Sequence, residues 1–367
     1  MNILLVSESF PGDRNGIGRV AENIQESLIS VGVNVAVISS FKVRSFDGRF
    51  DIDSNTKLFD GSVISPFVGR SLFESLLIDL SPDKIILLCA QYWGSDYLID
   101  MFKRGNTLHS VIFYSHGLSW LHTLPKNPIK YIKVRRYLQK LKESLIMFEK
   151  IIVLDLMLDD AHWMNEAGFD FDVLPNSASS DYFVPVDELD NSSTGMIGTC
   201  VGNMSSLKNQ LTTLQTLINI DPLCIFYFIY PQDNKYSTML IEYWSHHHDK
   251  CNNLKVFFID NMNHKDQVSL VRNANFSIFS SLIEAQPIVV LECIAACVPY
   301  ISLRVGCVEH LGGGVVCELS NFEDKVLRII SSHDLRKKLS NEALLVRNRY
   351  SIDTFKSGIV SIVGVGE

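Results

Sequence analysis

Apolar runs of strand length alternate with helical patterns along almost the whole chain. In the first half the predicted strands are residues 2–6, 34–39, 84–89, 111–114 and 151–154. In the second half they are residues 199–201, 223–230, 255–259, 276–279 and 300–303. Such alternation is typical of a parallel sheet with helices on both faces. The sequence therefore predicts an α/β fold whose second half repeats the architecture of the first.

The length of 367 residues predicts two domains of ordinary size. A stretch rich in Asp, Ser and Pro follows the Leu-Pro-Asn-Ser step at 174–177 and runs to about Thr194. Such a composition indicates a crossing between domains. We expect an N-terminal domain over residues 1–175 and a C-terminal domain over residues 176–349.

Composition and charge exclude several classes of protein. The net charge of −8 argues against a general nucleic-acid binder, which would carry a basic footprint. The apolar runs are strand-sized, far below the roughly 18 residues of a membrane span, and the N-terminus lacks the features of a signal peptide. Eight scattered cysteines without a Cys-x-x-Cys pair fit a reducing compartment. We expect a cytoplasmic protein.

Residues 280–299 form a loop and a helix between two predicted strands. Glu284 lies in the loop, and Glu292 lies in a helix that is otherwise apolar on every side. A helix that is hydrophobic all round is buried, so Glu292 is predicted to be an interior acid that needs hydrogen-bond partners. A ligand diol or a backbone helix end would both serve. The helix N-terminus also offers free N–H groups to an anion.

Other strand ends carry candidate binding groups. Gly16 and Gly18 lie in the first loop, before a helix predicted at about 19–31, and let the backbone approach a phosphate closely. The third glycine of a dinucleotide fingerprint is missing, which makes a dehydrogenase a weak reading. Lys208 follows the first strand of the second half and can neutralise a phosphate beside a helix N-terminus. His116 ends a predicted strand where open α/β sheets bind ligands, and a structural role fits it as well.

One segment is strongly basic on this acidic protein. Between residues 126 and 142 there is no acidic residue and there are seven basic ones: Lys126, Lys130, Lys133, Arg135, Arg136, Lys140 and Lys142. Isoleucines and tyrosines interleave with them. A basic helix with such residues is typical of a contact with an anionic lipid surface. A solvated helix face is the alternative.

We predict no metal site. The Asp-x-Asp pairs at 51–53 and 170–172 have a spacing that is common by chance. The three histidines at 246–248 are adjacent, and adjacent residues do not share a helix face.

Together these residues resemble the retaining nucleotide-sugar glycosyltransferases of the GT-B fold, close to glycosyltransferase family 4. Glu284 and Glu292 match the Glu-x7-Glu motif of that family, and Lys208 matches the lysine of its diphosphate loop. The resemblance covers nearly the whole chain. Further matches are the Leu-Pro-Asn-Ser step, the glycine loop with Gly16 and Gly18, and His116 at the place of an active-site histidine.

The resemblance implies an architecture and a reaction. Two Rossmann-like domains face each other across a cleft, and the last helix, residues 350–367, packs back on the first domain. A sugar moves with retention from a nucleoside diphosphate, UDP by default, to a glycan or lipid-linked acceptor, as in the synthesis of cell-surface polysaccharides. No metal is needed, no covalent enzyme intermediate is established, and the acceptor attacks on the leaving-group face.

The resemblance also implies roles for single residues. Glu292 binds the ribose hydroxyls, Glu284 lies near the donor sugar, and Lys208 holds the diphosphate. The backbone amides around Gln286 and Ile288 face the phosphates, and His116 lies in the active site.

Three positions depart from the family pattern. Asn203 stands in place of the usual arginine of the diphosphate loop, Pro287 lacks an N–H, and Cys297 replaces a glycine. The missing charge could be supplied by one of three arginines, Arg14, Arg19 or Arg304. Two alternatives therefore stay open: a non-catalytic subunit that binds nucleotide or glycan, and a sugar-nucleotide epimerase.

Overall fold

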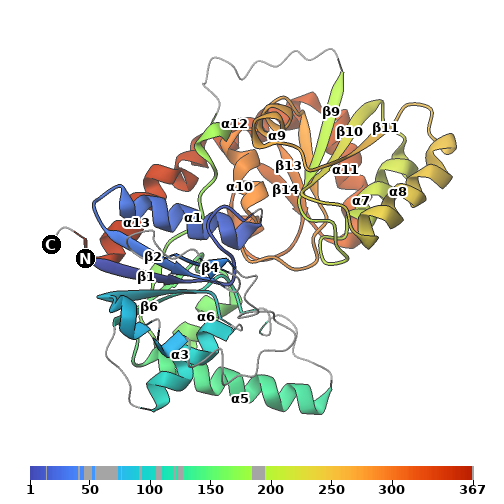
Figure 1. The fold of residues 1–367 in the computed structure, drawn as a ribbon. Coiled ribbons are helices and arrows are strands. Elements are labelled where there is room, and N and C mark those ends of the chain that lie inside the picture. Colours follow the sequence, from blue (N-terminus) through green and yellow to red (C-terminus); the bar gives the residue numbers. More distant parts are fainter. Residues whose placement is uncertain are drawn as a thin grey trace. The chain divides into compact units, whose positions relative to one another are not determined.

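A computed structural model gives the fold of the chain. It describes residues 1–13, 15–39, 42–44, 52–53, 73–75, 77–90, 93–104, 110–118, 121, 127–183 and 195–365. The chain forms two compact units, one of Met1–Pro175 with Phe355–Glu367 and one of Asn176–Thr354. Each unit is a sheet with flanking helices (Figure 1).

The first unit is built on an eight-stranded sheet of order β4-β3-β2-β1-β5-β6-β7-β8. Its strands are β1 (Asn2–Val6), β2 (Asn34–Ile38), β3 (Lys42–Arg44), β4 (Ile52–Asp53), β5 (Lys84–Leu88), β6 (Ser110–Tyr114), β7 (Lys150–Val153) and β8 (Asp172–Val173). β1, β2 and β5 to β8 pair in parallel, and β3 and β4 extend the β2 edge in antiparallel pairing. The sequence did not predict β3, β4 or β8, which are too short to show a periodic pattern.

Helices cover both faces of this sheet (Figure 1). They are α1 (Gly16–Ile29), α3 (Trp93–Lys103), α5 (Pro128–Leu145), α6 (Asp159–Glu166) and α13 (Ile352–Val363). α3, α5 and α6 share a buried core with Leu4 and Val6 of β1. Because successive side chains of a strand point to opposite faces, Ile3 and Leu5 are buried on the face of α1 and α13.

Helix α1 begins three residues earlier than the predicted residue 19. The side chain of Asn15 caps it by accepting a hydrogen bond of 2.8 Å from the Gly18 N–H. A Cβ on Gly18 would lie 2.6 Å from the carbonyl oxygen of Asp13. The close packing of the loop on the first helical turn thus accounts for a glycine at this position.

The second unit is built on a six-stranded parallel sheet of order β11-β10-β9-β12-β13-β14. Its strands are β9 (Met196–Val201), β10 (Cys224–Tyr230), β11 (Lys255–Asp260), β12 (Phe276–Phe279), β13 (Tyr300–Leu303) and β14 (Gly314–Cys317). This is the strand order of a Rossmann-like sheet. The order reverses between β9 and β12, which pair side by side. Only β14 was not predicted from the sequence.

The helices of the second unit are α7 (Gln210–Ile220), α8 (Lys235–His247), α9 (His264–Arg272), α10 (Ile288–Ala295), α11 (Phe322–Ser331) and α12 (His333–Val346). α7, α8 and α11 share a core with Phe226, Phe228 and Phe276 of the sheet. The two Rossmann-like domains predicted from the sequence are therefore confirmed as folds. Residues 184–194 of the predicted crossing lie outside the described residues. In the part of the chain that the structure describes, no helix is long and apolar enough to cross a membrane.

Candidate active site

Two loops meet at the point where the strand order of the second sheet reverses. One loop, residues 202–209, follows β9, and the other, residues 280–287, follows β12. Because β9 and β12 are neighbouring parallel strands, both loops leave the same edge of the sheet. Ligands of open α/β sheets bind outside the carboxyl ends of the strands at this kind of switch point.

Hydrogen bonds tie the two loops into one body. The Leu282 N–H donates to the Leu207 carbonyl at 2.8 Å. The Ser280 hydroxyl donates to the Asn209 carbonyl at 2.8 Å and itself accepts from the buried Thr213 hydroxyl at 2.8 Å. Asn209 adopts a left-handed conformation with φ of 54°, which favours Gly or Asn. Lys208, between these anchored residues, is held in a defined position.

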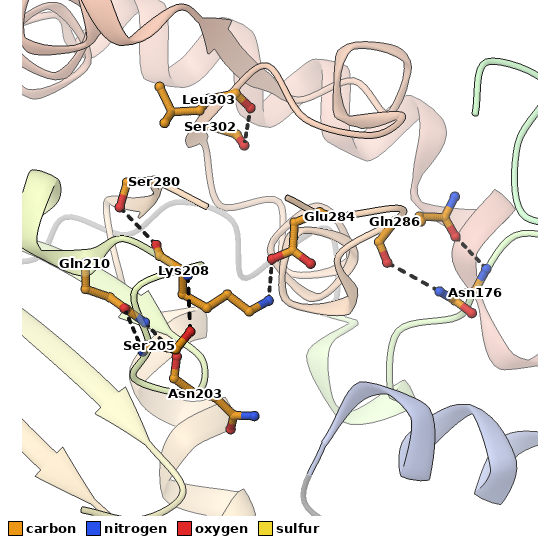
Figure 2. A network of polar contacts seen from close by, with 10 residues as sticks. All are labelled: Asn176, Asn203, Ser205, Lys208, Gln210, Ser280, Glu284, Gln286, Ser302 and Leu303. Carbon is orange, nitrogen blue, oxygen red and sulfur yellow. Dashed lines mark hydrogen bonds and ion pairs between the residues drawn. The ribbon is translucent and has the colours of Figure 1, made fainter. Parts of the chain in front are cut away.

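The side chain of Lys208 forms an ion pair with the carboxylate of Glu284 (Figure 2). The Lys208 side chain is 32% exposed and the Glu284 side chain is 15% exposed. Both line a pocket whose other lining residues include Ser280, Ser281, Pro287 and Val289. The fold thus brings together two of the predicted site residues, which are separated by 76 positions in the sequence.

Glu292 lies inside helix α10 and is 7% exposed, as the sequence predicts for an interior acid. Helix α10 ends at Ala295, four residues before Pro299, the last residue of the loop and helix segment predicted from the sequence. Cys297 follows it with φ of 55°, and the Val298 N–H bonds back to the Cys293 carbonyl at 2.9 Å. A left-handed residue commonly closes a helix, and it is usually glycine. Cys297 therefore adopts a backbone conformation that glycine usually provides at a helix end.

Gln286 and Ile288 lie at the start of α10. Ile288 is the first helical residue, and Pro287 before it provides no side-chain cap. The Gln286 side-chain oxygen accepts a hydrogen bond of 2.6 Å from the Asn176 N–H (Figure 2). The buried Gln286 Nε2 and Asn176 Oδ1 have no hydrogen-bond partner among the described residues. The Gln286 side chain thus contacts the Leu-Pro-Asn-Ser step.

Asn203 does not replace the charge of the family arginine. Its side chain points away from the Lys208–Glu284 pair (Figure 2), and its carbonyl accepts a hydrogen bond of 2.8 Å from Gln210 Nε2. Arg304 is paired with both Glu309 and Glu318, and these partners raise the pKa of its guanidinium.

The other two arginines considered for the same purpose lie in the first unit. Arg19 is paired with Glu22 of the same helix at 3.2 Å. Arg14 lies outside the described residues. Among the described residues that line the pocket, Lys208 is the one cation.

Three other predicted site residues, Gly16, Gly18 and His116, belong to the first unit. Gly16 and Gly18 are part of the first turn of α1, where the Gly18 N–H is already bonded to Asn15. His116 follows β6, with its ring centroid 4.6 Å from that of Tyr114. Burial lowers the pKa of His116 to about 3, so the imidazole is neutral near pH 7. Its Nε2 is buried and has no hydrogen-bond partner within the described part of the chain.

Within the described residues, no cluster of three or more His, Cys, Asp or Glu side chains is arranged to hold a metal ion. The three histidines at the end of α8 each contact a backbone carbonyl through Nδ1. Asp172 is near Lys150, at 3.6 Å, and Asp51 lies outside the described residues.

The chain was compared with known proteins. Residues 242–345 match the family model of the glycosyl transferases group 1. This match includes Glu284 and Glu292. A search of curated proteins by sequence found no match.

Solved structures give the fold of the whole chain. The sucrose-phosphate synthase from Thermosynechococcus elongatus is 15% identical, with a TM-score of 0.77, over 99% of this chain and 98% of the other. HepE from Anabaena, in complex with UDP-glucose, is 12% identical with a TM-score of 0.70 over 99% of both chains. WaaG, a glycosyltransferase involved in lipopolysaccharide biosynthesis, is 13% identical with a TM-score of 0.69 over 99% of this chain and 100% of the other.

Part of this chain matches the group 1 glycosyl transferases, and the whole chain has a GT-B fold. The family match and the fold together indicate a glycosyltransferase. Sequence reasoning singled out Glu284 and Glu292 and did not point to the supporting residues Ser280, Gln210 and Thr213. Those residues act through hydrogen bonds to loop carbonyls and side chains, and no spacing rule signals such contacts.

Proposed function

We propose that this protein is a retaining glycosyltransferase that uses a nucleoside diphosphate sugar as donor. The observation that carries the proposal is the Lys208–Glu284 pair in a pocket at the switch point of the second sheet. A cation beside an uncapped helix N-terminus suits a diphosphate. The nearby carboxylate suits the hydroxyls of a sugar, because charge-assisted hydrogen bonds are about twice as strong as neutral ones.

In the proposed reaction the bond between the sugar C1 and the diphosphate oxygen breaks, and a bond from C1 to the acceptor oxygen forms. The acceptor hydroxyl loses its proton to the departing diphosphate on the same face. Negative charge on the diphosphate grows as the sugar leaves. Lys208 and the first N–H groups of α10 therefore stabilise the transition state more than the ground state. Glu284 orients the sugar, and Glu292 binds the ribose.

In the same proposal His116, in the first unit, donates or accepts a hydrogen bond with a hydroxyl group of a substrate. A neutral imidazole whose Nε2 has no partner among the described residues suits a hydroxyl group, which can act as donor or acceptor. The loop with Gly16 and Gly18 belongs to the acceptor-side domain. The proposed chemistry needs no metal.

The favoured donor is a UDP-sugar and the favoured acceptor is a glycan or lipid-linked intermediate of cell-surface polysaccharide synthesis. The fold relative HepE is described in complex with UDP-glucose, and WaaG in lipopolysaccharide biosynthesis. These descriptions support the choice of UDP-glucose as a donor to test and of a cell-surface glycan or glycolipid as the acceptor.

We also propose that helix α5 contacts an anionic membrane surface from the cytoplasmic side. Val134, Leu138 and Leu141 bury one face of α5 in the first unit. On the outer side Ile129 is 67% exposed and Ile132 is 50% exposed. They lie among the exposed basic residues Lys130, Lys133, Arg135, Arg136 and Lys140, and Lys142 on the same helix is partly buried. Lys126 lies outside the described residues. Apolar and basic side chains on one exposed helix suit the boundary between headgroups and acyl chains.

The deciding experiment incubates the protein with UDP-glucose, UDP-galactose and their GDP and ADP counterparts, with and without a glycan lipid extract. Release of nucleoside diphosphate together with a glycosylated acceptor supports the transferase. A changed sugar on an intact nucleotide identifies an epimerase. Thermal stabilisation by nucleotide without any turnover identifies a binding subunit, because a ligand of the folded state raises its stability.

A further inference from the structure

Asp160 is a buried carboxylate that the proposed reaction does not use. It is the second residue of α6 and is 1% exposed. Its Oδ2 accepts hydrogen bonds from the Ser115 hydroxyl and, at 3.2 Å, from the Gly117 N–H. Its Oδ1 accepts from the Ala161 N–H at 3.1 Å. One carboxylate thus joins the start of α6 to the loop after β6.

The two donors to Asp160 Oδ2 are the residues on either side of His116. Tyr114, the residue before Ser115, is also anchored. Its hydroxyl donates to the Leu174 carbonyl at 2.7 Å, and its ring contacts the His116 imidazole. The segment from residue 114 to 117 is therefore fixed at three points. His116 Nε2, in contrast, is buried and has no hydrogen-bond partner among the residues that the structure describes.

Burying an acid has a free-energy cost unless other groups compensate. Burial raises the pKa of Asp160, while the hydrogen bonds from Ser115 and Ala161 lower it. The N-terminus of α6 also favours negative charge. Among the described residues Asp160 has no ion-pair partner, so its compensation comes from hydrogen-bond donors, and two of those donors belong to the histidine loop.

We propose that Asp160 is a positioning residue for His116, which holds the loop after β6 so that the imidazole presents Nε2 to a ligand. The nature of that ligand, a hydroxyl group of a substrate, rests on the proposed function. The positioning itself does not depend on it. Asp160 acts through Ser115 and Gly117 and does not touch the substrate.

The test is an NMR titration of the histidine rings in the full chain, in the parent protein and in Ser115→Ala and Asp160→Asn. In the parent protein the His116 ring should stay neutral down to about pH 4. In both variants the freed loop should admit water, and the pKa of His116 should rise by at least about one pH unit toward the ordinary value. Ser115→Ala keeps the test decisive where Asp160→Asn fails to fold.

The matched control is Ser144→Ala. Ser144 is also a buried serine, but its hydroxyl donates to the backbone carbonyl of Lys140 and not to Asp160. It should leave the His116 signal in place. An unchanged His116 titration in a folded Ser115→Ala variant would overturn the proposal and leave Asp160 a plain structural anchor. Absence of sugar transfer from UDP-glucose would count against the proposed function alone, since the titration needs no substrate.

Discussion

The ammonium group of Lys208 is paired with the carboxylate of Glu284. Among the described pocket-lining residues, the positive charge available for a diphosphate is therefore already neutralised by a neighbouring acid. A donor that binds here has to exchange that pair for two new contacts, the diphosphate on Lys208 and the sugar on Glu284. This exchange gives Glu284 opposite effects on a bare nucleotide and on a nucleotide sugar.

Glu284→Gln should strengthen the binding of free UDP by a few-fold and lower the turnover of a UDP-sugar. The free nucleotide has no sugar to contact Glu284, and loss of the carboxylate leaves Lys208 with its full charge for the phosphates. Calorimetric titration with UDP measures the first effect. Glu242→Gln, the same change at an exposed position of α8, should alter neither quantity. Weaker UDP binding in Glu284→Gln would contradict the exchange.

Lys208→Ala should lower kcat about a hundredfold, because loss of one preorganised contact with developing charge costs on the order of 3 kcal/mol. The affinity for the donor should fall less than the rate, since the contact strengthens as the sugar leaves. Steady-state kinetics with the active donor measures both. Lys255→Ala on the exposed edge strand β11 serves as control. An equal loss of kcat in Lys208→Ala and Lys255→Ala would show that Lys208 has no specific role in the reaction.

Glu292→Gln should weaken nucleotide binding about tenfold and keep the melting temperature within a few degrees of the parent. Glutamine preserves the shape of this buried side chain and loses the charge that strengthens hydrogen bonds to ribose hydroxyls. Isothermal titration and thermal unfolding on the same sample separate the two effects. A large drop in melting temperature with unchanged nucleotide affinity would assign Glu292 to the core.

The stability of the chain should depend on pH through His116. Its folded-state pKa of about 3 lies below the ordinary value of 6.5, so the unfolded state binds the extra proton between these values. Stability is then lost as pH falls below about 6.5, by up to about 2 kcal/mol at pH 5. His116→Asn should remove this part of the pH dependence. Urea unfolding at pH 5 and pH 7 measures it, with His162→Asn on α6 as the control.

Reversing the charge of Lys130, Lys133 and Arg136 should abolish sedimentation of the protein with phosphatidylserine vesicles. Each basic residue near an anionic surface contributes about 1 kcal/mol. The control variant reverses Lys255, Lys337 and Lys338, three exposed residues of the second unit, and has the same net charge. It should still sediment. Equal binding of both variants to the vesicles, or no vesicle binding by the parent protein, would contradict the membrane proposal.

Local sequence determined the class of fold and the main elements. The strands at 276–279 and 300–303 have the predicted bounds, because short apolar runs between loop residues have few other stable states. Glu292 could be placed in a buried helix from the residues around it. The resemblance to a known family added the link between Glu284, Glu292 and Lys208, and the structure does not test the roles it implies.

Only the tertiary structure decided how charges and hydrogen bonds are shared. Pairing between Lys208 and Glu284 depends on β9 and β12 being neighbours in the sheet, which no local pattern records. The hydrogen bonds from Ser115 and Gly117 to Asp160 likewise join two segments that are distant in sequence. Arg304 pairs with Glu309 and Glu318, and the sequence does not show that these side chains point toward one another. Periodicity tells which residues are buried, since burial follows from the pattern of each element. It does not tell which buried polar groups meet, because that depends on the packing of several elements at once.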